Sequence, residues 1–142
     1  MSFTEKEAGY LQSQRLGRLA TIGPDGAPHN VPVGFRYNAE LGTIDIGGHA
    51  LGQTRKFHDV QAEPRVAFVV DDLASVDPWT PRGIEIRGMA QALPEGGQTI
   101  GPNFGTELIR ITPRRITAWG IDTPPFSKPN ARNVTTRQGS AT

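Results

Sequence analysis

The sequence of 142 residues predicts a mainly β protein, an antiparallel barrel that is closed or split and carries one N-terminal and one mid-chain helix. Apolar and polar residues alternate in about seven short runs, the period of β-strands. Turn residues separate these runs at the spacing expected of an antiparallel barrel or sandwich. The one strong helical pattern lies mid-chain, where a helix can plug a barrel end, so we favour the barrel.

Composition and charge limit the classes of function. The 15 cations and 14 anions give a net charge of +1, which provides little attraction for nucleic acid. No apolar run approaches the ~18 residues of a membrane span, and the N-terminus lacks the pattern of a secretory signal. Without cysteine the chain has neither disulfides nor a thiolate zinc site. We expect a cytoplasmic protein with one domain over residues 1–121, and neither nucleic acid nor membrane as a partner.

The first predicted element is a short helix over residues 3–15. Thr4 and Glu7 form the pattern of a capping box, in which each side chain binds the other residue's backbone N–H. Ala8 and Leu11 share one face of this helix. We therefore expect it to pack over one mouth of the barrel.

A β-hairpin follows the helix. Arg15–Ile22 is the first strand, the turn residues 23–26 reverse the chain, and Pro28–Tyr37 alternates as a half-buried second strand. Pro32 removes a ladder donor and Gly34 offers no side chain to pack. Either this strand is an edge, or its free backbone faces a flat ring system.

The third strand, Thr43–Ile46, leads into the stretch Gly47–Val60, which we interpret as a possible anion seat. Three glycines permit close backbone approach, and a helix then begins beside Arg55 and Lys56. Unpaired N–H groups and the helix dipole favour negative charge at such an end.

The helix pattern places Ala50, Thr54, Phe57 and either Val60 or Gln61 toward the core, and Arg55, Lys56 and Asp59 away from it. Adjacent helical residues diverge by about 100°, so the two cations need not reach one phosphate. Taken alone, the Arg-Lys pair is more often a solvated helix face.

The second half of the chain predicts four more strands, a long irregular connection and a loop. The strands are Arg65–Val70, Ile84–Ala90 with a bulge at Gly88, Thr106–Thr112 and Arg114–Ile121; the connection covers residues 72–83 and the loop 93–105. From residue 122 to 142 the chain is polar and rich in proline. Such a tail is either disordered or ordered only by lying across a partner or ligand.

Metal and hydrolytic chemistry are poorly supported. The histidines, His29, His49 and His58, lack metal-ligand spacing, and no G-x-S-x-G elbow is present. The paired acids Asp71 and Asp72 end a strand, where a solvated terminus is the usual explanation. We therefore predict no metal ligand and no catalytic side chain.

Several motifs together resemble the pyridoxamine 5′-phosphate oxidase-like split-barrel family, in particular its flavin/deazaflavin oxidoreductase branch in actinobacteria. The motifs are Leu19–Ile22 with Pro24–Gly26, Pro28–Val33, Thr54–Phe57, Glu63–Phe68, Trp79 with Pro81–Gly88, and Ala131–Val134. The last two are similar to a subgroup that depends on the deazaflavin coenzyme F420. The resemblance covers nearly the whole chain.

The resemblance implies a split β-barrel of the FMN-binding type, a homodimer with a cofactor in each of two interface clefts. It implies that Thr54, Arg55 and Lys56 contact the cofactor phosphate, that Val31, Pro32 and Val33 line the ring, and that Gly47, Gly48 and His49 approach the ribityl chain. Trp79 and Arg82 would come from the neighbouring subunit, and Arg132 would reach the cofactor's acidic tail.

The chain is shorter than the vitamin B6 oxidases and lacks their terminal arginine and histidine elements, which argues against that activity. The expected function is hydride transfer from reduced coenzyme F420 to a small unsaturated acceptor. The alternatives are an FMN-dependent oxidoreductase and a non-catalytic carrier of F420 or flavin.

Overall fold

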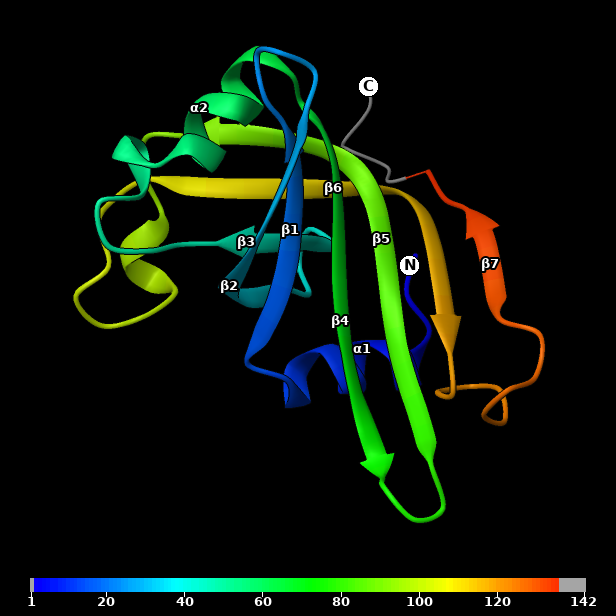
Figure 1. The fold of residues 1–142 in the computed structure, drawn as a ribbon. Coiled ribbons are helices and arrows are strands. Elements are labelled where there is room, and N and C mark those ends of the chain that lie inside the picture. The colour runs from blue at the N-terminus through cyan, green and yellow to red at the C-terminus, as the bar shows by residue number, and fades with distance from the viewer. Residues whose placement is uncertain (1, 136–142) are drawn as a thin grey trace.

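The strands form one seven-stranded antiparallel sheet, and β3 closes six of them into a barrel because it pairs with β2 on one side and β6 on the other. The computed structural model describes residues 2–135 (Figure 1). The sheet order is β3-β2-β1-β4-β5-β6-β7. The strands are β1 Leu16–Ile22, β2 Pro28–Asn38, β3 Thr43–Ile46, β4 Arg65–Ser75, β5 Thr80–Leu93, β6 Leu108–Trp119 and β7 Asn130–Asn133. The prediction of a mainly β split barrel with two helices is confirmed.

Helix α1, Glu5–Ser13, begins with the predicted capping box. The Glu7 amide donates to Thr4 Oγ1 over 3.1 Å, and the Thr4 amide donates to Glu7 Oε1 over 2.9 Å. These bonds satisfy two N–H groups that the helix itself leaves free. The helix lies across one end of the barrel (Figure 1) and inserts Leu11 into the core.

Helix α2, Arg55–Ala62, follows β3 after a 3₁₀ turn, Leu51–Gln53, and packs at the other end of the barrel (Figure 1). Phe57 and Val60 are buried as predicted, whereas Ala50 and Gln61 are exposed. Ala50 adopts a left-handed φ of 46°, so the helical pattern does not extend back to it. Among the described residues, no helix is both long and apolar enough for a membrane crossing.

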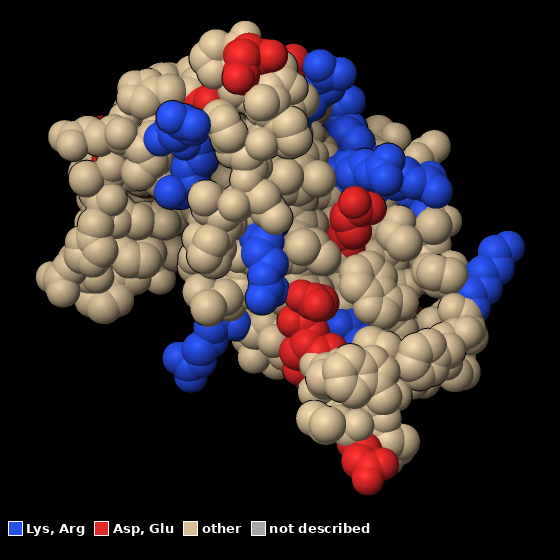
Figure 2. Space-filling model, in the orientation of Figure 1, with Lys and Arg blue, Asp and Glu red and all other residues tan. Residues whose placement is uncertain are grey.

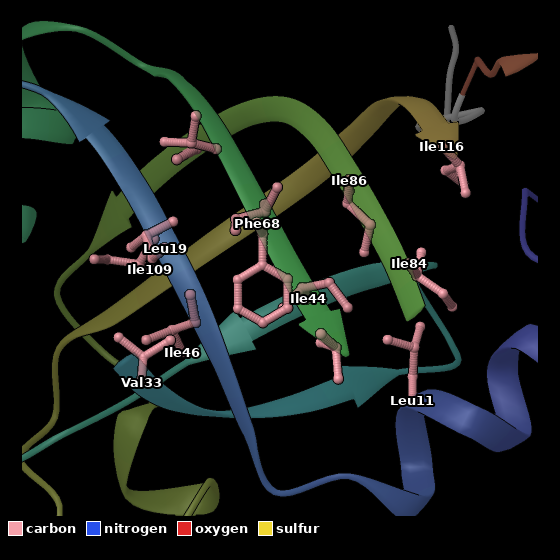
Figure 3. Close-up of a cluster of buried hydrophobic side chains, with 14 of the residues drawn as sticks. Leu11, Leu19, Val33, Ile44, Ile46, Phe68, Ile84, Ile86, Ile109 and Ile116 are labelled. Carbon is pink, nitrogen blue, oxygen red and sulfur yellow. The ribbon is translucent and has the colours of Figure 1, made fainter. Parts of the chain in front are cut away.

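The core lies inside the barrel, where inward-facing side chains of the strands meet Leu11 (Figure 3). Phe68 of β4 is fully buried at its centre. Its ring lies against Gly17 of β1, where an added Cβ atom would come within 2.2 Å of the ring. Gly17 therefore makes room for the largest fully buried side chain of the core.

The connection expected over residues 72–83 is instead the end of a long β-hairpin. Strands β4 and β5 remain paired through Asp72–Arg82 and Leu73–Pro81 before the turn. This hairpin extends beyond the barrel (Figure 1), and most residues near its tip are exposed. The prediction was wrong because a strand exposed on both faces carries no alternation of apolar and polar residues.

The two strands expected on either side of Pro113 are one strand, β6. The pairing of β5 with β6 shifts register between Arg87 and Gly88, so Arg114 bulges out and Pro113 faces Gly88. The bulge predicted at Gly88 is therefore confirmed. A bulge accommodates a proline without ending the strand, which corrects the predicted break.

The tail contains the last strand of the sheet. Strand β7 pairs with β6 from Arg115–Asn133 to Ala118–Asn130, and the Val134 amide donates to the Arg114 carbonyl over 2.8 Å. Order in this part of the tail therefore does not require a partner or ligand, contrary to expectation. The remainder of the predicted tail, residues 136–142, lies outside the described residues.

Candidate functional site

The predicted anion seat at the N-terminus of α2 begins with a threonine cap. Thr54 Oγ1 accepts from the Phe57 amide at 3.4 Å, while its own O–H donates to the Leu51 carbonyl over 2.6 Å. The amides of Arg55 and Lys56 belong to the first turn, where no intrahelical carbonyl is available. Thr54 therefore fixes the helix start, and these two amides provide donors for an anion.

Arg55 and Lys56 diverge, as their adjacent positions on a helix require. Arg55 is exposed and borders an open cleft of about 610 Å³. The other residues lining this cleft are Pro24, Asp25, His29, Gln53, His58 and Asp59. Lys56 is half-buried, and burial lowers the pKa of its ammonium group. A bound anion would favour the charged form of Lys56 again.

His29 connects this helix start to strand β2. Arg55 Nη1 lies 3.2 Å from His29 Nε2, and His29 is two residues before Val31 on the strand. The structure therefore brings the predicted phosphate-binding helix next to the strand predicted to follow the cofactor ring. In the sequence, more than twenty residues separate the helix start from this strand.

Part of strand β2 is an edge. Its residues 28–34 pair with β1, whereas β3 pairs only with residues 35–38. Pro32 is exposed, Val31 is 37% exposed and Val33 is buried. The interpretation of Pro32 as an edge residue is confirmed. Val31 was expected to be buried on the same face as Val33, but it is exposed. The strand from His29 to Val33 presents about 13 Å of this edge.

Asp59 points inward, which corrects its predicted outward position. Its side chain is 3% exposed, and its Oδ2 accepts from Thr21 Oγ1 at 2.7 Å and from His29 Nδ1 at 2.8 Å. The turn end of the β1–β2 hairpin lies against α2 (Figure 1) and covers this side of the helix. The helical period of the sequence predicts one buried face of α2, so it could not show that the side carrying Asp59 is buried as well.

Opposing effects set the pKa of Asp59. Burial raises it, but the hydrogen bonds from His29 and Thr21 and the nearby Arg55 charge together hold it below its ordinary value of 3.8. Asp59 is therefore an anion at neutral pH. His29, Asp59 and Thr21 are the residues that sequence reasoning missed, since no local pattern links positions on three different elements.

We expect the protein to lose stability in acid through Asp59. A lowered folded-state pKa contributes stability that is present above 3.8, and this contribution disappears as the pH falls through the folded value. Urea unfolding between pH 5 and about 2.5 measures this loss. The Asp59→Asn variant should show a shallower decline, and an identical decline in both proteins would contradict the expectation.

The predicted glycines approach another part of the chain. A Cβ atom on Gly47 would lie 2.9 Å from the Phe104 ring, and the Gly48 carbonyl accepts from the Gly105 amide at 3.0 Å. The His49 ring is exposed and packs edge-on against Phe104, with centroids 5.7 Å apart. The close approach permitted by Gly47 is therefore to the loop before β6.

The structure does not bring Trp79 or Arg82 to this cleft within one chain. Trp79 is 58% exposed near the tip of the β4–β5 hairpin. Arg82 donates to both carboxylate oxygens of Asp72, over 2.8 and 3.0 Å, and lies over the Tyr10 ring. These contacts hold Arg82 at the opposite end of the barrel from α2 (Figure 1).

Arg132 forms an ion pair at the α1 end of the molecule. Its guanidinium donates to both oxygens of the fully buried Glu7 and to the Ser2 carbonyl. On the face shown in Figure 2, several cationic side chains gather at the upper right beside an anionic one, and over the rest of that face the two signs are interspersed.

Comparisons with known proteins agree with this architecture. A family model described as pyridoxamine 5′-phosphate oxidase matches residues 3–120. A reductase from Streptomyces rimosus is 50% identical over 139 residues, which are 98% of each chain. It is named for 5a,11a-dehydrotetracycline and 5a,11a-dehydrooxytetracycline.

Solved structures share the fold. A conserved hypothetical protein from Mycobacterium tuberculosis superimposes with a TM-score of 0.66 at 26% identity, covering 84% of this chain and 86% of that one. General Stress Protein 26 from Bacillus anthracis gives a TM-score of 0.64 at 23% identity, covering 92% and 97%. At these low identities the likeness concerns the barrel itself.

Proposed function

This chain belongs to the pyridoxamine 5′-phosphate oxidase family, and on that premise we propose that it is an oxidoreductase that uses the deazaflavin coenzyme F420. In this proposal a hydride passes from the reduced coenzyme to a small unsaturated organic acceptor. The half-identical Streptomyces rimosus relative, itself named a reductase, supports the reaction type.

One contact carries the proposal. Arg55 Nη1 lies 3.2 Å from His29 Nε2, which places a cationic helix start at the end of the free edge of β2. A phosphate bound at Arg55, Lys56 and their amides would leave the rest of an extended cofactor to follow that edge past Val31, Pro32 and Val33. The donor set suits a phosphate, because arginine offers a planar fork and lysine a compact charge.

The reduced coenzyme would supply the hydride, so the chain's own residues serve to bind, orient and exclude water. Lys56 and Arg55 would hold the phosphate, and Thr54 would maintain the helix start that presents their amides. Gly48 and His49, in the segment between β3 and α2, would border the cofactor's middle section. We assign no catalytic side chain.

FMN is the alternative cofactor, because its phosphate would fit the same seat. Titrating the purified protein with F420 and with FMN, each followed by fluorescence, compares the two directly. We expect tighter binding of F420. Tighter binding of FMN would replace the deazaflavin proposal with a flavin enzyme.

The acceptor to test first is 5a,11a-dehydrotetracycline, because the half-identical relative is named as its reductase. Oxidation of reduced F420 can be followed by absorbance with this compound and a panel of other conjugated alkenes. Tight F420 binding with no acceptor reduced across the panel would favour a carrier protein instead.

Replacing Lys56 with alanine should weaken cofactor binding by about 1.5–3 kcal/mol, the contribution of one charged hydrogen bond. The dissociation constant from the same titration measures this change. Lys128→Ala is the matched control, because Lys128 is exposed in the segment before β7. Equal affinities of the two variants would remove Lys56 from the site.

We also propose a homodimer in which the cofactor lies at the interface. Exposed apolar side chains support it, namely Leu16 on β1, Val31 on β2, and Leu73, Val76 and Trp79 on the protruding hairpin. Such a hairpin could carry Trp79 to the partner's cleft, whereas Arg82 is already bound to Asp72. Sedimentation equilibrium tests the stoichiometry, and a monomer at micromolar concentration would contradict it.

A further inference from the structure

A buried carboxylate determines which nitrogen of His29 carries its proton. Asp59 Oδ2 lies 2.8 Å from His29 Nδ1, and the Asp59 side chain is 3% exposed. An ionised carboxylate only accepts hydrogen bonds. His29 Nδ1 must therefore be the protonated nitrogen, and in the neutral ring Nε2 is left with a lone pair.

That lone pair faces the guanidinium of Arg55. The distance from Arg55 Nη1 to His29 Nε2 is 3.2 Å, and a guanidinium can only donate. The contact is a hydrogen bond only if His29 carries its proton on Nδ1. In the other neutral tautomer, the Nε2–H group of His29 would face an N–H group of Arg55, and two donors cannot form a hydrogen bond.

The ring of His29 is itself held in place. It packs against the backbone of the β1–β2 turn, since a Cβ atom on Gly23 would lie 2.6 Å from His29 Cε1. Thr21 donates to the same Asp59 oxygen that His29 binds, over 2.7 Å. The charged or titratable groups that share the cleft with His29 are Asp25, Arg55, His58 and Asp59.

We propose that His29, with its tautomer fixed by Asp59, is a positioning residue that holds the Arg55 guanidinium ready for the cofactor phosphate. This inference rests on the proposed function, in which Arg55 is a phosphate ligand. An unrestrained arginine side chain is flexible and must be immobilised when the phosphate binds. A partner that orients Arg55 beforehand reduces that cost.

The tautomer can be observed without any variant. Nitrogen-15 NMR of the neutral imidazole groups should show His29 with Nδ1 protonated and Nε2 unprotonated. In the double variant Thr21→Val, Asp59→Leu, which replaces both buried polar partners with apolar groups, only the Arg55 contact still favours this tautomer. The fraction of the His29 ring that is protonated on Nδ1 should therefore fall. A wild-type ring protonated on Nε2 would overturn the proposal.

The effect on binding is measured with two probes, F420 and the deazaflavin core that lacks its phosphate and acidic tail. The dissociation constant of the core divided by that of F420 reports the joint contribution of the phosphate and the tail. His29→Leu should lower this ratio by about two- to tenfold, the usual cost of ordering one long side chain. In an Arg55→Ala background the same substitution should have no further effect.

The outcomes separate the two proposals. If Arg55→Ala leaves the ratio as high as the matched Arg18→Ala variant does, Arg55 is not a phosphate ligand and the proposed site fails. If Arg55→Ala lowers the ratio but His29→Leu does not, only the positioning role fails. If His29→Leu lowers the ratio equally with and without Arg55, its role is structural and the inference is overturned.

Discussion

Replacing Arg132 with methionine is expected to lower the free energy of unfolding by about 3–5 kcal/mol, the effect of leaving a buried charge without its partner. Glu7 is fully buried, and Arg132 donates to its oxygens over 2.5 and 2.9 Å and to the Ser2 carbonyl over 2.8 Å. The substitution would remove all three bonds and leave the Glu7 carboxylate with the Thr4 amide but without its charged partner. It would also loosen β7, which carries Arg132 to its place beside α1.

Urea unfolding followed by tryptophan fluorescence measures this loss. Arg115→Met is the matched control. Arg115 lies on β6 next to β7, and its one side-chain hydrogen bond, to Asn133 of β7 over 2.9 Å, is exposed. The control should change stability by less than about 1 kcal/mol. A different result would contradict this structural role. If Arg132→Met leaves the free energy of unfolding unchanged but weakens F420 binding, Arg132 contacts the cofactor, as the family resemblance implies.

The second large effect is expected at Asp45, whose replacement with alanine should cost about 3–5 kcal/mol of stability. The Asp45 side chain is fully buried in β3 and accepts two bonds from Arg110, both of 3.0 Å. Thr43 and Asn38 donate to it as well, over 2.9 and 3.0 Å. Alanine would leave the guanidinium of Arg110 without its carboxylate partner.

This ion pair joins the two strands whose pairing closes the barrel, since Asp45 lies opposite Arg110 in the β3–β6 ladder. We therefore expect Asp45→Ala to lower the midpoint of urea unfolding strongly. The control is Asp71→Ala, which breaks the exposed pair between Asp71 and Arg18 and should cost about 1 kcal/mol or less. Similar midpoints for the two variants would show that Asp45 contributes no more than a surface charge.

Much of the fold could be predicted because its signals are local. Thr4 and Glu7 specify a helix start within four residues, and the first three strands were found by alternation and turn residues. The errors arose where that local signal fails. The β4–β5 hairpin leaves the barrel and loses its alternation, and β6 continues past Pro113 because a bulge opposite Gly88 accommodates it.

The candidate site was predictable in part for the same reason. The glycine-rich bend, the helix start and its two cations are contiguous, so Arg55 and Lys56 could be selected from the sequence. The contact between Arg55 and His29 could not, because it joins positions 26 residues apart on a helix and a strand. Asp59 was misplaced because the β1–β2 turn covers a side of α2 that the helical period assigns to solvent.

The sequence by itself determined the first three strands, both helices, the capping box that begins α1, and the two adjacent cations at the start of α2. Only the tertiary structure decided how the charged side chains pair: Asp59 with His29, Asp45 with Arg110, and Glu7 with Arg132. Propensity, capping and periodicity act over a few residues. The partner of a buried charge depends on which distant strands the closed barrel brings together.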